Sequence, residues 1–194
     1  PLITYSKWYK ARQNSCGQPV PGCEIRIQSS DPLNIPGELQ VRGENVFLGY
    51  YKNEEATAEV MDKDGWFHTG DMGVMDDEGF LFLKGRSKCM ILGPSGQNIY
   101  PEEIEGVLNN VTYVVDSLVV EDHGTLVSLI YPDYHQAELD GLSKSELEAK
   151  LQEALPEINK QIPNYAKITK MEFMPEDFER TPKRSIKRYL YQRN

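Results

Sequence analysis

"GRSKCMILGPSGQNIYPEEIE" spans residues 85–105 and marks a change of pattern along the chain. Short alternating segments and turns precede it, and helical spacing follows it. Within it, Gly93 and Gly96 flank a Pro-Ser pair, after which a Gln-Asn pair leads into an acidic helix start. A P-loop would need Gly-Lys-Ser/Thr at this point, and a dinucleotide fingerprint would need a third glycine in a βαβ unit. Neither is present, so residues 93–98 are predicted to be a surface loop and not a phosphate cradle.

The chain has 194 residues and a net charge of −9, with 39% hydrophobic and 26% charged residues, the balance of a soluble globular protein. No apolar run of the sequence approaches the roughly 20 residues of a membrane span. The acidic balance disfavours nucleic acid as a partner, whereas peripheral membrane contact stays open. Three cysteines form no CxxC pair, which favours a reducing, cytoplasmic location. The first residues carry no initiator Met, and we expect the chain to be part of a longer one.

The last fifteen residues concentrate cations in an otherwise acidic chain. Six cations lie here, with no acid after Glu179: Arg180, Lys183, Arg184, Lys187, Arg188 and Arg193. Such a tail has three interpretations, which are a solvated basic end, a nucleic-acid patch and a site for a small polyphosphate.

Residues 1–85 are predicted to form a β-rich subdomain. Ile25 and Ile27 alternate with polar neighbours, which is the period of a half-buried strand. After a Pro/Gly turn, Leu39 and Val41 repeat the pattern. A short helix capped by an asparagine and a hairpin with Asp-Gly and Glu-Gly turns follow.

Residues 86–194 are predicted to form a smaller α+β domain, which makes the fold class α+β. Pro101 suits the first turn of a helix, and Ser143 with Glu146 forms a capping box for a later one. Apolar residues then follow at helical spacing: Leu147, Leu151, Leu155, Ile158 and Ile162. Pro156 is predicted to kink or split this helix.

Thr69-Gly70-Asp71 ends a predicted strand in a tight turn. A carboxylate beside glycine is able to accept two hydrogen bonds from a diol such as a ribose, although composition alone favours Asp71 as a turn cap. The hairpin returns Arg86 toward this strand, so the two side chains together suit the sugar and phosphate of a nucleotide. His68 has no partners at ligand spacing, and we predict a structural role for it and no metal site.

Two segments, "GELQVRGENVFLGYYKNEEATAEVMDKDGWFHTGD" (residues 37–71) and "GFLFLKGRSKCMILGPSGQNIYPEEIE" (79–105), resemble the AMP-forming, adenylate-forming acyl-CoA synthetase family. The match begins at "GQPVPGCEIRI" (17–27) and covers nearly the whole chain. The loop 88–98 is one residue longer than the commoner version, as in the long-chain fatty acyl type. The resemblance implies that residues 1–85 end the large N-terminal AMP-binding domain and that 86–194 form the small, mobile C-terminal lid domain.

The resemblance also implies roles for single residues. Asp71 of "TGD" would bind the ribose hydroxyls of ATP and of the acyl-adenylate, and Arg86 of "GR" would hold the ribose and phosphate end. Lys88 matches the hinge about which the small domain swings between adenylation and thioester formation. The glycine-rich loop would line the pantetheine passage of CoA, where glycine lets the backbone pass close to a thin ligand. Its cofactor-binding residues would be Gly93, Gly96, Gln97 and Asn98.

One catalytic position departs from the family. The family places a lysine in a pattern T-P-x-x-K-I-x-R, and residues 181–188 read TPKRSIKR, with Ser185 at the lysine position. A hydroxyl cannot supply the positive charge that stabilises the pentavalent phosphorus. Either Lys183 or Lys187 serves instead, with Lys187 slightly favoured, or the function is weakened. An extended segment would put Lys183, Ser185 and Lys187 on one face.

We therefore predict the C-terminal part of an ATP-dependent acid–thiol ligase. It would convert a carboxylic acid, expected to be a long-chain fatty acid, to acyl-AMP and then to acyl-CoA, by positioning and charge stabilisation across a domain closure. ATP or AMP, CoA and Mg²⁺ would take part, and the magnesium ligand and phosphate loop of the family lie upstream of this chain. These residues alone are expected to be inactive. The alternative is a non-catalytic adenylate-binding or interaction module of the same fold.

Overall fold

The computed structural model describes residues 2–193, which form two compact units that divide between Cys89 and Met90. Each unit has a sheet and a hydrophobic core of its own. The predicted α+β class is confirmed, because strands dominate the first unit and helices and strands mix in the second. The change of pattern predicted at 85/86 lies slightly before this division, since a short 3₁₀ helix, η1 (Ser87–Cys89), still belongs to the first unit.

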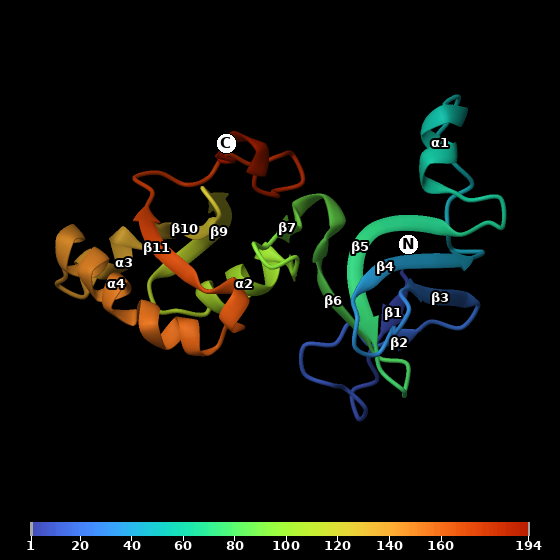
Figure 1. The fold of residues 1–194 in the computed structure, drawn as a ribbon, viewed down its shortest axis with the longest axis horizontal. Coiled ribbons are helices and arrows are strands. Elements are labelled where there is room, and N and C mark those ends of the chain that lie inside the picture. The colour runs from blue at the N-terminus through green and yellow to red at the C-terminus, as the bar shows by residue number, and fades with distance from the viewer. Residues whose placement is uncertain (1, 194) are drawn as a thin grey trace. The chain divides into compact units, whose positions relative to one another are not determined.

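An antiparallel meander forms the first unit, with strands that follow one another in sequence lying side by side in the sheet (Figure 1). Its strands are β3 (Cys23–Gln28), β4 (Gly37–Gly43), β5 (Phe67–Met75) and β6 (Leu81–Arg86). Ile27, Leu39 and Val41 are buried, as their alternation predicted, and they pack with Cys23 and Leu81. The alternate positions of β4 are polar, so the sheet has one apolar face and one polar face.

Shorter elements complete the first unit. β1 (Thr4–Tyr5) and β2 (Gln18–Pro19) pair in a small antiparallel sheet, and α1 (Glu54–Val60) lies between β4 and β5 in sequence. The predicted cap of α1 is confirmed, because the Asn53 Oδ1 accepts the N–H of Ala56 at 3.0 Å.

The second unit has a three-stranded sheet in the order β11-β10-β9 (Figure 1). Its elements are β7 (Ile91–Leu92), β8 (Asn98–Ile99), α2 (Pro101–Leu108), β9 (Val114–Asp122), β10 (Thr125–Pro132), α3 (Tyr134–Leu139), α4 (Lys144–Lys160), the 3₁₀ turn η2 (Asn164–Ala166), β11 (Ile168–Phe173) and η3 (Arg188–Leu190). β9 and β10 form an antiparallel hairpin, whereas β11 is parallel to β10. A parallel pair needs a long crossover, and α3 and α4 provide it.

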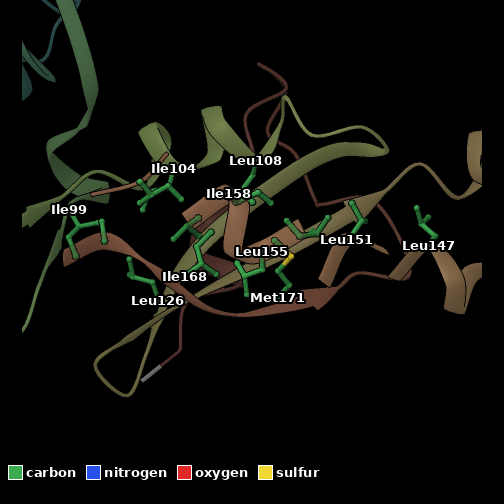
Figure 2. Packing of buried hydrophobic residues seen from close by; sticks show 14 of the residues in the cluster. Ile99, Ile104, Leu108, Leu126, Leu147, Leu151, Leu155, Ile158, Ile168 and Met171 are labelled. Carbon is green, nitrogen blue, oxygen red and sulfur yellow. The ribbon is translucent and has the colours of Figure 1, made fainter. Parts of the chain in front are cut away.

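Helix α4 carries the apolar stripe that its spacing predicted. The capping box of Ser143 and Glu146 is present, and the stripe is buried against α2 and the sheet (Figure 2). The prediction that Pro156 splits the helix is wrong, because α4 continues unbroken to Lys160, and a kink at Pro156 stays a prediction. Pro156 and Gln152 are both exposed, so water can satisfy the Gln152 carbonyl that lacks an N–H partner.

The sheet of the second unit is covered on both faces. Val119, Leu126 and Ile130 pack with the helices. Leu118 and Val127 point to the opposite face, where they form a separate hydrophobic cluster with residues of the C-terminal segment. That cluster includes Phe178 and Tyr191, whose rings meet edge to face with centroids 5.3 Å apart. The basic tail is therefore part of the folded unit.

Candidate functional site

A bulge in β5 carries the Thr69–Asp71 turn. Glu38 pairs with Met72 and Gln40 pairs with His68, so three residues of β5 lie opposite one residue of β4. Gly70 has a φ of +71°, the left-handed region that favours glycine. Bulges of this kind bend a strand and redirect its side chains.

Thr69 closes the turn with its hydroxyl. The Thr69 Oγ1 donates to the Leu39 carbonyl at 2.8 Å and accepts the Asp71 N–H at 3.0 Å. The first bond ties the bulge to strand β4, and the second closes the turn within β5. Asp71 is thereby presented from a fixed backbone.

Asp71 and Arg86 face each other across β5 and β6. The register pairs the two residues directly, and the Arg86 Nε lies 2.9 Å from the Asp71 Oδ1. The Arg86 Nη1 also donates to the Thr69 carbonyl at 3.2 Å. The prediction that the hairpin returns Arg86 to the Asp71 strand is confirmed. The side chains are 28% and 60% exposed, so both remain accessible to a polar ligand.

Glu38 supports this turn from β4 and was missed at the sequence level. Its Oε1 accepts the Gly70 N–H at 3.1 Å, and its Oε2 lies 2.8 Å from the His68 Nδ1. The available signal was the polar side of β4, where Glu38 and Gln40 alternate with buried apolar residues. The sequence could not show which strand lies beside them.

Lys88 lies in η1, directly before the division between the two units, and its side chain is exposed. A hinge would need to lie at such a connection. The hinge role of Lys88 stays a prediction.

The glycine-rich loop joins β7 to β8 as a tight hairpin, a pairing that the sequence did not predict. The Gly93 N–H donates to the Gln97 carbonyl at 2.8 Å, and the Gly96 N–H donates to the Gly93 carbonyl at 2.9 Å. Gly96 has a φ of +81° and open space where a Cβ would lie. The turn itself therefore requires glycine at this position. Asn98 begins β8 and is exposed.

Beside this hairpin lies a mainly apolar pocket of about 300 Å³. Ile91, Leu92 and Pro94 form one side, and Leu126 and Tyr165 form another. It lies wholly within the second unit. No local pattern along the chain indicated this pocket, because its lining residues come from elements far apart in the chain.

The expected extended segment around Ser185 is instead a tight turn. The Thr181 N–H donates to the Ser185 carbonyl and the Arg184 N–H donates to the Thr181 carbonyl, both at 2.8 Å. Arg184 has a φ of +63°. The prediction that Lys183, Ser185 and Lys187 share one face of an extended segment is therefore wrong, because the chain reverses direction between them. Lys183 lies exposed in this turn.

Lys187 is paired with an acid of its own segment. Its Nζ lies 3.0 Å from the Glu179 Oε2, and this carboxylate raises the pKa of Lys187. Lys183 forms no ion pair or side-chain hydrogen bond with any described residue. Of the two lysines, Lys183 is the one available to an external anion.

Most other tail cations are also paired with acids of the second unit. Arg180 lies 2.6 Å from Asp116, and Arg193 contacts Asp122 at 2.9 Å. Arg188 forms a two-pronged pair with Glu105, which is 7% exposed. Burial raises the pKa of Glu105, and Arg188 opposes that rise. This pairing disfavours the nucleic-acid interpretation of the tail.

Within residues 2–193, no group of three His, Cys, Asp or Glu side chains is placed to hold a metal ion. The helices found in this part of the chain are too short or too polar to cross a membrane.

Comparison with known proteins places the chain in a family. Residues 90–194 match the family model of the AMP-binding enzyme C-terminal domain. The long-chain-fatty-acid–CoA ligase FadD15 of Mycobacterium tuberculosis is 32% identical over 207 residues, which covers 96% of this chain and 33% of that protein. A 2-succinylbenzoate–CoA ligase of Bacillus cytotoxicus is 45% identical over 109 residues, 55% of this chain and 22% of the relative.

A solved structure of a CoA synthetase is also similar to this chain. The O-succinylbenzoate coenzyme A synthetase of Bacillus subtilis, in complex with ATP and magnesium ion, has a TM-score of 0.75 and 27% identity over 92% of this chain and 35% of that one. The chain thus spans about a third or less of the length of these relatives. It belongs to the AMP-binding enzyme C-terminal domain family, and its relatives are adenylate-forming acyl-CoA synthetases.

Proposed function

We propose that this chain is part of an ATP-dependent ligase that activates a carboxylic acid as acyl-AMP and transfers the acyl group to CoA. The observation that carries the proposal is the Asp71–Arg86 pair, held at a bulge and exposed to ligand. The relatives named as CoA ligases support it. The first unit would end the large AMP-binding domain, and the second would be its lid.

Each residue of the pair suits one part of a nucleotide. The Asp71 carboxylate accepts hydrogen bonds from the ribose hydroxyls, because an ionised carboxylate only accepts. Arg86 donates to the ribose and phosphate end while it steadies Asp71. In the first step the substrate carboxylate attacks the α-phosphorus and pyrophosphate leaves. In the second step the CoA thiol attacks the acyl carbon and AMP leaves.

The positive charge for the first step would come from the turn at 181–185. Lys183 is the better candidate than Lys187, because Glu179 already neutralises Lys187. The hairpin loop 93–98 would line the pantetheine passage, and Lys88 would be the hinge. Mg²⁺ would be bound by the upstream part of the protein, as the family resemblance implies.

A long-chain fatty acid is the proposed substrate. The relative that covers 96% of this chain carries a long-chain-fatty-acid–CoA ligase name. The 2-succinylbenzoate ligase, at higher identity over a shorter span, makes an aromatic acid the second candidate. A cytoplasmic location is further proposed, supported by three cysteines that form no disulfide.

The test is acid-dependent ATP–pyrophosphate exchange by the full-length protein that carries this chain, with palmitate, octanoate and 2-succinylbenzoate. We expect exchange with palmitate. Asp71→Asn should raise the KM for ATP about tenfold or more, as the loss of hydrogen bonds to a charged group implies. Lys183→Ala should reduce exchange about tenfold, and Lys187→Ala should not.

Binding of AMP without exchange for any acid would favour the non-catalytic adenylate-binding module. If Asp71→Asn supports ATP–pyrophosphate exchange with normal ATP kinetics, Asp71 only caps the turn. Equal, near-normal exchange in both lysine variants would remove the tail from the reaction.

A further inference from the structure

A single carboxylate lies beneath the turn that carries Asp71. Glu38, on β4, binds the Gly70 N–H through Oε1 at 3.1 Å and contacts the His68 Nδ1 through Oε2 at 2.8 Å. These two contacts lie on either side of Thr69. One side chain therefore contacts β5 both directly before the turn, at His68, and within it, at Gly70.

The bulge explains why Gly70 needs this partner. Gly70 has no partner residue in the register of β4 and β5, so its N–H lacks an ordinary ladder acceptor. A part-buried backbone N–H without an acceptor is unfavourable. The Glu38 oxygen replaces the missing carbonyl, and it does so at the residue whose φ of +71° sets the direction of the next side chain, Asp71.

Glu38 itself is held by a polar network. Gln40 is 1% exposed, and its Nε2 lies 3.5 Å from the Glu38 Oε2 and 3.1 Å from the His68 Nδ1. Arg26 donates to the Gln40 Oε1 at 2.6 Å and so fixes the orientation of that amide. Asp62 lies 4.0 Å from the other His68 nitrogen. Rotation of the Glu38 carboxylate would break its contacts with Gly70, His68 and Gln40.

We infer that Glu38 is a positioning residue for the Asp71–Arg86 pair. It holds the left-handed turn at Gly70, so that Asp71 stays directed to Arg86 and to the nucleotide. Arg86 also donates to the Thr69 carbonyl, so the same turn steadies both members of the pair. The inference rests on the proposed nucleotide role of Asp71, which its test treats separately.

The variants are Glu38→Leu and Glu38→Gln in the full-length protein. Leucine removes the acceptor for the Gly70 N–H, whereas the glutamine amide oxygen can still accept it. Glu24→Leu is the matched control, because Glu24 lies on the neighbouring strand β3 and binds Arg42, away from the turn. Thermal unfolding of each variant reports whether the fold survives.

Kinetics provide the first readout. We expect Glu38→Leu to raise the KM for ATP about tenfold and to leave the KM for the acid unchanged. The KM for ATP of Glu38→Gln should remain much closer to that of the unmodified protein, and Glu24→Leu should leave ATP kinetics unchanged. Provided that Asp71→Asn raises the KM for ATP, an unchanged KM for ATP in Glu38→Leu, or equal effects of leucine and glutamine, would overturn the inference. So would a parallel rise in the KM for the acid.

Amide hydrogen exchange is the second readout and does not depend on activity. Glu38→Leu should speed exchange in the peptide that contains residues 69–71, and Glu24→Leu should not. Unchanged exchange in Glu38→Leu would overturn the inference. If exchange rises in Glu38→Leu but Asp71→Asn leaves ATP kinetics normal, Glu38 still positions the turn and the proposed nucleotide role of Asp71 is wrong.

Discussion

Arg188→Met should destabilise the second unit strongly. Glu105 is 7% exposed in α2, and its carboxylate accepts the Val119 N–H at 2.7 Å and the Arg188 Nη1 at 2.9 Å. Methionine retains much of the arginine bulk but removes the cation. Breaking a buried ion pair by removing one partner costs about 3–5 kcal/mol. We expect a loss of stability at the lower end of this range, since Glu105 retains its bond to the Val119 N–H and can take up a proton.

The loss should grow with pH. Without Arg188, only the Val119 N–H still opposes the effect of burial, so the pKa of Glu105 rises further above its ordinary value. Between the unfolded pKa of about 4.3 and the raised folded pKa, the folded state binds more protons than the unfolded state. The free energy of unfolding therefore falls as pH rises through that window. The variant should lose more stability at pH 8 than at pH 5.

Urea unfolding at pH 5 and pH 8, followed by far-UV circular dichroism, measures this effect. Most of the helix lies in the second unit, so the signal reports that unit. Arg188→Met with Glu105→Gln should abolish the extra pH dependence. Arg193→Met is the matched control, because its pair with Glu172 is partly exposed and should contribute at most about 1 kcal/mol. A loss below 1 kcal/mol for Arg188→Met, or an equal loss at both pH values, would refute the reasoning.

Three further substitutions test the loop and the hinge. Gly96→Ala should destabilise the second unit by about 1–2 kcal/mol, because an alanine at a φ of +81° is strained. Gly106 lies inside α2 with open space around it, so Gly106→Ala should stabilise the second unit by about 0.5–1 kcal/mol. Urea unfolding measures both, and equal effects would contradict the turn argument. Lys88→Pro fixes φ next to the division between the units and should slow thioester formation more than adenylation. An equal decrease in the rates of the two half-reactions would count against a hinge.

Local features of this chain could be predicted from the sequence because each depends on a few neighbouring residues. The alternation of Leu39 and Val41 placed the buried face of β4, and Ser143 with Glu146 placed the start of α4. The hairpin before Arg86 followed from its turn residues, which is why its return to Asp71 could be foreseen. The family resemblance then assigned roles to those positions.

Other features depended on contacts between segments that are distant in sequence. The support of Gly70 by Glu38 follows from a bulge register between two strands, which no local pattern reports. Likewise, the pairing of Arg188 with Glu105 spans 83 residues and turned a basic tail into part of a folded core. The reversal at Arg184 overrode the expected extended segment, because turn bonds and packing against the sheet outweighed a simple two-residue alternation. Periodicity and caps act within one element, whereas register, burial of charge and the direction of a side chain arise only when elements pack.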